Sequence, residues 1–258
     1  MAGICPYCNE QRRMTREHIF PGWLSRWRGP KISFSDSFPG RGIRADLIIR
    51  DVCRVCNNGI LADLDSYAES VLRPILEAEL GKSVSIIADA RLLRWVLKVG
   101  YNSERASRPE EVDELRRFVP FITGLDPTPP RQIDLMAALI SPVRSTPEEQ
   151  AAGAGPMLEV SGDKIGEQSC FGSAVLIAPV MSVGPVILQV LAWPPGAGPS
   201  VRHQILRTMQ TGMGFERLRG GVEVTLHPGQ MDARSWLRNV TLDGPDVVVE
   251  PARRSRES

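Results

Sequence analysis

The sequence predicts an α+β protein in which a small zinc-braced segment precedes a larger domain of helices and strands. Two Cys-x-x-Cys pairs near the N-terminus predict the metal brace. Apolar residues then recur at helical spacing over 60–80, and from residue 133 short β-branched runs alternate with turn residues. A chain of 258 residues with 42% hydrophobic content is long enough to bury a substantial core.

The four cysteines of the two pairs have the spacing of a structural zinc site. Each pair, Cys5 with Cys8 and Cys53 with Cys56, forms a tight knuckle that supplies two thiolates to one tetrahedral ion. Free or disulfide-bonded cysteines and a redox Cys-x-x-Cys are the alternatives, and the redox interpretation leaves the second pair unexplained. Thiolates on zinc imply a reducing compartment, so we expect a cytoplasmic protein. Cys170 is the fifth cysteine and is expected to be a small core residue.

The residues between and beyond the knuckles resemble the zinc-knuckled HNH endonucleases of the ββα-metal type. One subgroup carries Glu-His-Ile-x-Pro-x-Trp-Leu, found here at 17–24, and Cys-x-x-Cys-Asn-Asn-Gly, found at 53–59 and followed by Leu64 and Asp65. A Trp-x-x-Lys at Trp95 and Lys98 is also similar to later parts of that subgroup. The resemblance covers about the first quarter of the chain well. The matching motif residues are Cys5, Cys8, Glu17, His18, Cys53, Cys56 and Asn57.

The resemblance implies a metal-dependent endonuclease that hydrolyses phosphodiester bonds of nucleic acid, with DNA favoured as substrate. It assigns His18 as the general base, and imidazole suits that task at neutral pH. It assigns Glu17 and the amide oxygen of Asn57 to a catalytic Mg²⁺ or Mn²⁺, which prefers hard oxygen ligands. Because adjacent strand residues face opposite sides, Glu17 and His18 share one site only if the strand ends or bulges there.

Three further residues are weaker candidates for this site. Asp46 stands where many family members have an Asn that braces the hairpin. Asn57 and Asn58 both stand at an expected helix start, where Asn is a favoured cap, so a purely structural role for either stays open. Asp65 lies about two turns beyond Asn58 on the same helical face, as a candidate near the metal or, as the favoured interpretation, a surface carboxylate.

Charge is unevenly distributed along the chain. Ten basic and five acidic side chains within 1–58 give this segment a charge of +5, whereas the whole chain carries +1. A basic face on the motif-bearing segment suits contact with phosphates, although a solvated surface also explains such clusters. The alternatives to a nuclease are a catalytically degenerate zinc-stabilised module that binds nucleic acid and a zinc-folded platform for protein interaction.

We expect no signal peptide, because only Met1-Ala2-Gly3-Ile4 precede Cys5, and no membrane span in the remaining chain. Residues 170–200 carry no charge, but Gly184-Pro185 and Pro194-Pro195 interrupt them and indicate a buried β-hairpin. We expect an HNH-like domain over 1–82, an α+β domain over 83–252 and a disordered basic tail over 253–258. Expected strands are 12–20, 46–52, 133–143, 157–161, 173–181, 186–193, 222–226 and 247–250. Expected helices are 23–27, 60–80, 88–105, 109–118 and 201–209.

Overall fold

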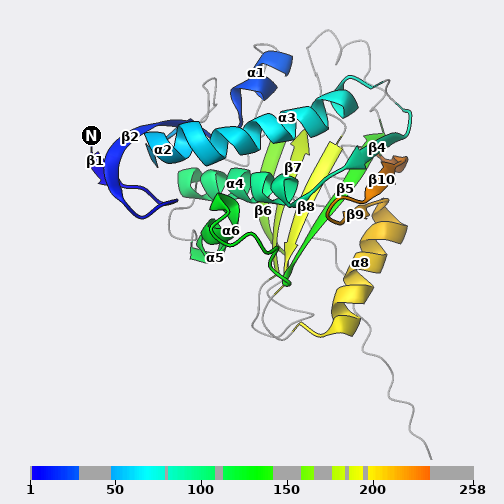
Figure 1. Cartoon of the computed structure of the whole chain (residues 1–258). Coiled ribbons are helices and arrows are strands. Elements are labelled where there is room, and N and C mark those ends of the chain that lie inside the picture. The colour runs from blue at the N-terminus through cyan, green and yellow to red at the C-terminus, as the bar shows by residue number, and fades with distance from the viewer. Residues whose placement is uncertain are drawn as a thin grey trace, which may run out of the picture.

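The computed structural model of the chain contains both helices and strands, which confirms the α+β class (Figure 1). The structure describes residues 2–28, 48–78, 81–107, 113–141, 158–165, 176–183, 186–193 and 197–232. Asp46, Cys170, the expected strand 247–250 and the expected tail 253–258 lie outside these ranges. Within the described ranges, no helix is long and apolar enough to cross a membrane.

The N-terminal segment forms a three-stranded antiparallel sheet of order β1-β2-β3. Its strands are β1 (Ala2–Ile4), β2 (Gln11–His18) and β3 (Ile48–Cys53), and α1 (Gly22–Arg28) follows β2. The expected hairpin of two long strands is therefore present, with a short extra strand on its outer edge.

A long helical segment follows β3 directly. It consists of α2 (Arg54–Cys56), a π-helical turn η1 (Asn57–Leu61) and α3 (Ala62–Leu76), with a kink at Gly59. The helix begins earlier than the sequence predicts because the Cys53 sulfur accepts the backbone N–H of Cys56 and caps α2. Pro74 lies in the last turn of α3, which ends at Leu76, before the expected end at residue 80, because proline does not continue a regular helix.

The chain then forms β4 (Val84–Ile87) and the long helix α4 (Ala90–Ser107). Two short helices, α5 (Asp113–Arg116) and α6 (Val119–Thr123), stand near the expected helix 109–118. Gly124 ends α6 with a left-handed backbone at φ 79°, a conformation that glycine adopts without steric cost. Helix α4 confirms the prediction made from its apolar spacing.

The C-terminal part is a six-stranded sheet with the path β11-β5-β8-β7-β6, on which β9 pairs with β5. Strands β7 and β8 pair antiparallel, which confirms the uncharged hairpin, and β10 pairs with β4 in a separate two-stranded sheet. The elements are β5 (Ile133–Ser141), β6 (Leu158–Ile165), β7 (Leu176–Val183), β8 (Val186–Ala192), α8 (Pro199–Met213), β9 (Glu216–Leu218), β10 (Glu223–Leu226) and β11 (Pro228–Asp232).

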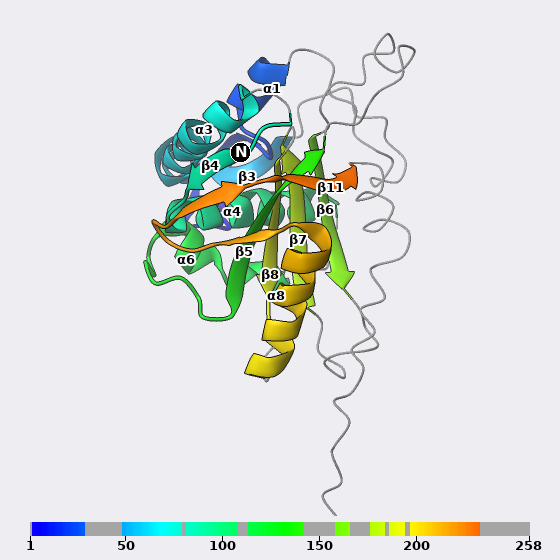
Figure 2. The same cartoon turned by 90° about the vertical axis from the view of Figure 1, so that its right-hand side faces the viewer.

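Helix α4 lies between the N-terminal segment and the large sheet. It packs against α3 on one side and against β6, β7 and β8 on the other (Figures 1 and 2). One cluster of buried apolar side chains runs from Cys5 through α3 and α4 to β8 and Leu226. The core is thus continuous across residues 82/83, and the division into two domains at that point stays a prediction.

Candidate functional site

The four cysteines of the two Cys-x-x-Cys pairs meet in one cluster. Their Sγ atoms all lie within 4.8 Å of one another, and Cys8 Sγ is 3.8 Å from Cys53 Sγ. A tetrahedral zinc ion with Zn–S bonds of about 2.3 Å requires sulfurs about 3.8 Å apart. All four cysteines are free, so they form no disulfide among themselves. Cys5, Cys8, Cys53 and Cys56 can therefore hold a metal such as zinc.

The electrostatics of the cluster also suit a cation. Burial alone raises the pKa of the Cys5 thiol, but backbone N–H groups of Cys53, Cys8 and Tyr7 lower it below its ordinary value. Burial, followed by the neighbouring sulfurs, raises the pKa of the Cys56 thiol far above its ordinary value. Thiols crowded in this way do not all ionise by themselves, and a zinc ion would compensate four thiolates together.

The end of β2 carries Glu17 and His18 at an irregular point of the hairpin. Thr15 pairs with Val52 and Glu17 pairs with Ile49, so β3 contains one more residue than β2 over this interval. His18 is the last residue of β2 and is half-buried, whereas the side chain of Glu17 is 5% exposed. The strand therefore bulges before Glu17 and ends at His18, and either feature allows these adjacent residues to share one site.

Asn57 connects the start of the helical segment to β2. Its Nδ2 donates to Thr15 Oγ1 at 2.9 Å and to the Arg16 carbonyl at 2.7 Å. Thr15 Oγ1 in turn donates to the Val52 carbonyl on β3 at 2.9 Å. The amide thus links the helix to both strands through its nitrogen, and its oxygen Oδ1 lies outside these two contacts.

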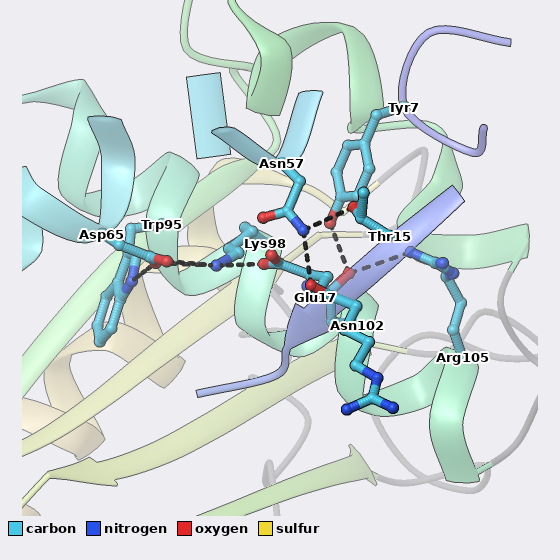
Figure 3. Close-up of polar contacts among 10 residues, drawn as sticks. Tyr7, Thr15, Glu17, Asn57, Asp65, Trp95, Lys98, Asn102 and Arg105 are labelled. Atoms are coloured by element: carbon cyan, nitrogen blue, oxygen red, sulfur yellow. Dashed lines mark hydrogen bonds and ion pairs between the residues drawn. The ribbon is translucent and has the colours of Figure 1, made fainter. Parts of the chain in front are cut away.

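The Glu17 carboxylate faces inward to a lysine of α4. Lys98 Nζ lies 2.7 Å from Glu17 Oε1, and 2.8 and 2.9 Å from the two carboxylate oxygens of Asp65 on α3 (Figure 3). Trp95 Nε1 donates to Asp65 Oδ1 at 2.9 Å. Glu17 Oε1 is buried with no hydrogen bond of normal geometry, so the ion pair with Lys98 is what compensates its charge.

Glu17, Asp65 and Lys98 form a charged triad. The pKa values of Glu17 and Lys98 are shifted by burial and by the charges of the other members. Burial raises the pKa of the Glu17 carboxyl, while Lys98 lowers it and Asp65 raises it further. The charge of a nearby His18 also lowers it. Burial alone would lower the pKa of Lys98, but the carboxylates of Asp65 and Glu17 raise it above its ordinary value. The ammonium is therefore held in its charged form although its side chain is 0% exposed.

A second buried polar contact joins the first knuckle to α4. The Tyr7 hydroxyl donates to Asn102 Oδ1 at 2.6 Å, and Arg105 Nη1 donates to the same oxygen at 3.1 Å (Figure 3). Arg105 also pairs with Asp51 on β3. The Tyr7 ring meets Tyr101 edge-on, with ring centroids 5.6 Å apart. One helix therefore contacts both the knuckle and the hairpin.

The tryptophan that follows the Glu-His pair belongs to the packing of the molecule. Trp23 of α1 is 3% exposed and stacks on Trp95 of α4, with ring centroids 6.4 Å apart. The expected helix over 23–27 is therefore present as α1, and its tryptophan is part of the core. Trp95 thus contacts both Trp23 and Asp65.

The structure thus brings most of the predicted site residues to one end of the hairpin. Glu17, His18 and Asn57 lie at or against the end of β2, and Asn58 lies in η1. Asp65 is not a solvated surface carboxylate, because Trp95 and Lys98 both bind it.

Sequence reasoning assigned no role to the polar face of α4. Its buried polar residues Lys98 and Asn102 are 0% exposed. With Trp95 and Arg105 they recur every three or four residues along one side of the helix. Polar residues at helical spacing within an apolar helix are the signal that marks this face, but the sequence does not show which segment they meet.

Comparisons of this chain with protein-family models, with curated proteins and with solved structures give no match.

Proposed function

We propose that this chain is a metal-dependent endonuclease that cleaves phosphodiester bonds of nucleic acid, most simply DNA. The observation that carries the proposal is the joint placement of the four-cysteine cluster and of Glu17, His18 and Asn57 on one hairpin-helix unit. The resemblance to HNH endonucleases supports the same assignment. In this proposal zinc holds the fold, and a separate divalent cation serves the reaction.

The residues present suit a hard divalent cation. Glu17, Asp65 and Lys98 together carry one negative charge in excess, since two carboxylates meet one ammonium. Asn57 Oδ1 and the Glu17 oxygen that does not contact Lys98 are hard donors of the type that Mg²⁺ and Mn²⁺ prefer. Bound there, the cation would supply positive charge for the phosphate and its leaving oxygen.

The chain itself supplies the base and its surroundings. His18 takes the proton from a water molecule, which attacks phosphorus in line with the 3′ oxygen that leaves. Glu17 provides negative charge beside the imidazolium that forms. Asn57 holds the end of β2 against the helix, so that the base keeps its place. The 3′ oxygen leaves with the electrons of the P–O bond and takes a proton from solvent water, so the products are a 5′-phosphate and a 3′-hydroxyl.

The test is cleavage of supercoiled plasmid and of single-stranded DNA and RNA by the zinc-loaded full chain, with and without added Mg²⁺ or Mn²⁺. Removal of a general base costs about 10²- to 10⁴-fold in rate, and we expect this loss for His18→Ala. His203→Ala is the matched control, because His203 is exposed on α8. Equal rates for the two variants would overturn the assignment of His18.

One observation favours a second candidate, a catalytically degenerate zinc module that binds nucleic acid. The Glu17 oxygen Oε1 is already neutralised by Lys98, which leaves half of that carboxylate for a metal. In that case wild-type protein retards nucleic acid in a gel shift and leaves it intact with either cation. Cleavage that depends on His18 rules out this candidate.

A further inference from the structure

We infer that Lys98 is a positioning residue, whose buried ammonium fixes the Glu17 carboxylate and with it the end of β2 that carries His18. The inference rests on the proposed function in that the site being positioned is the nuclease site. It assigns a role to the Trp-x-x-Lys of α4, which sequence reasoning leaves without a mechanism.

Lys98 cannot touch a substrate, because its side chain is 0% exposed and its ammonium is enclosed by Glu17 and Asp65. Any effect on a reaction must therefore pass through another residue. Within the part of the chain that the structure describes, Lys98 contacts β2 through Glu17 alone. Glu17 immediately precedes His18.

The triad joins three elements that are distant in the sequence. Lys98 lies on α4, Asp65 on α3 and Glu17 on β2 (Figure 3). Asp65 receives two contacts from Lys98 and one from Trp95, so its carboxylate has a fixed orientation. The Lys98 ammonium is therefore held in place by Asp65, and in that position it orients the Glu17 carboxylate.

The cysteine cluster and the triad of Glu17, Asp65 and Lys98 lie beside different parts of β2. Met14 pairs with Cys53, so the middle of β2 lies beside the cluster, while Glu17 and His18 lie beyond the bulge. The register shift between Thr15 and Glu17 interrupts the backbone hydrogen bonds between β2 and β3, so these bonds hold the end of β2 less firmly than regular pairing would. The Lys98–Glu17 ion pair supplies the constraint where the ladder is irregular.

The first experiment is a double-mutant cycle for urea unfolding of the zinc-loaded full chain, with Lys98→Met, Glu17→Gln and the combination. Breaking a buried ion pair leaves a carboxylate uncompensated, so we expect Lys98→Met to lower the folding equilibrium constant at least about 100-fold. When Glu17 is already replaced by Gln, we expect Lys98→Met to lower the folding equilibrium constant by a factor at least about tenfold smaller. Equal losses in the two backgrounds would overturn the coupling.

The second experiment follows the imidazole NMR resonances of the three histidines, His18, His203 and His227. We expect Lys98→Arg and Asp65→Asn to shift the His18 resonances and to leave those of His203 and His227 in place. These two variants also serve if Lys98→Met does not fold. Arg91→Met is the matched control, because Arg91 makes an exposed ion pair on the same helix. Unmoved His18 resonances would overturn the inference.

Cleavage kinetics complete the test. We expect Lys98→Arg to lower kcat by about 10- to 100-fold with KM unchanged, because a misplaced base slows the reaction without weakening substrate contacts. A rise in KM with kcat unchanged would contradict a positioning role. If wild-type protein cleaves nothing, the proposed function fails, whereas the mutant cycle and the His18 resonances still decide the inference about Lys98.

Discussion

The hairpin-helix unit at the N-terminus and the six-stranded sheet share one apolar core but differ in the polar groups that they enclose. In the sheet, all seven residues of β8 are buried, and they are Val, Ile, Leu and Ala with one glutamine. The buried Asp134 on β5, which pairs with Arg202 and Arg217, is the charged exception. The N-terminal unit, formed by β1–β3, α2, η1 and α3, instead encloses four sulfurs and the charged contact between Glu17 and Lys98.

This difference shows how a small unit stays folded without an adequate core of its own. The large sheet buries apolar area on long strands, which is the dominant stabilising contribution in most domains. The N-terminal unit is small, and units of that size need a metal or a neighbouring surface. Its four cysteines can hold a metal, and the polar face of α4 contacts it through Lys98 and Asn102.

The largest expected effect is loss of the metal. Binding of a structural zinc ion contributes on the order of 10 kcal/mol in small zinc modules, so we expect Cys56→Ser to unfold the N-terminal unit. Hydrogen-exchange mass spectrometry should show lost protection over β2, β3 and α3 and retained protection over β5 and β8. Cys170→Ser, which leaves Cys5, Cys8, Cys53 and Cys56 unchanged, is the control and should keep one zinc ion per chain. If Cys56→Ser instead raised hydrogen exchange equally over the N-terminal unit and the sheet, the two regions would not differ in their dependence on the metal.

Truncating a core side chain of the sheet should have the opposite effect: it should destabilise the sheet and leave the cysteine cluster intact. Leu188 on β8 is 0% exposed, and Leu188→Ala is expected to cost about 3 kcal/mol in the free energy of unfolding. Because this residue belongs to the apolar interior, zinc content measured by thiol-reactive release should stay at the wild-type value. Release of zinc under conditions where the variant is folded would show that the two regions are less distinct than we describe.

The contact between the knuckle and α4 should have an intermediate effect. Asn102→Ala removes the acceptor of both the Tyr7 hydroxyl and the Arg105 guanidinium, and we expect a loss of about 2 kcal/mol. Tyr7→Phe removes one donor and should cost about 1 kcal/mol. Urea unfolding of zinc-loaded protein measures both losses. A larger loss for Tyr7→Phe than for Asn102→Ala would be inconsistent with the shared acceptor.

The smallest expected effect is a pH dependence at the start of α4. Asp89 accepts the backbone N–H of Arg91 at 2.7 Å and pairs with the Arg91 side chain. Burial alone would raise the pKa of Asp89, but these hydrogen bonds lower it below its ordinary value. A lowered pKa stabilises the fold above the unfolded value near 3.8, and this contribution is lost as pH falls through the folded pKa.

We therefore expect Asp89→Asn to lower stability by about 0.5 kcal/mol at pH 7, because the pair is partly exposed and screened by solvent. The difference from wild type should shrink as the pH falls from 5 to 3. Thermal unfolding of both proteins across this range measures it. A difference that grows on acidification would have the wrong sign for a stabilising carboxylate.

Local sequence was sufficient for much of this architecture. The spacing of Cys5, Cys8, Cys53 and Cys56 predicted the cluster, and apolar periodicity predicted α4. The uncharged stretch interrupted by Gly184-Pro185 predicted the β7–β8 hairpin. Short elements such as β4 and β9 were missed, because three or four residues carry too little periodicity to stand out. Their pairing with β10 and β5 depends on residues far away in the chain.

The sequence by itself determined the type of each long element and the four thiol ligands of the cysteine cluster, since both depend on neighbouring residues and short spacings. Only the tertiary structure placed the Glu17 carboxylate against Lys98 and made Asp65 the partner of Trp95. Periodicity shows which residues face inward, but it does not show which strand a helix face meets. That choice is made when α4 packs against α3 and reaches β2 through Lys98, because the ammonium and the two carboxylates stabilise the fold only as a group.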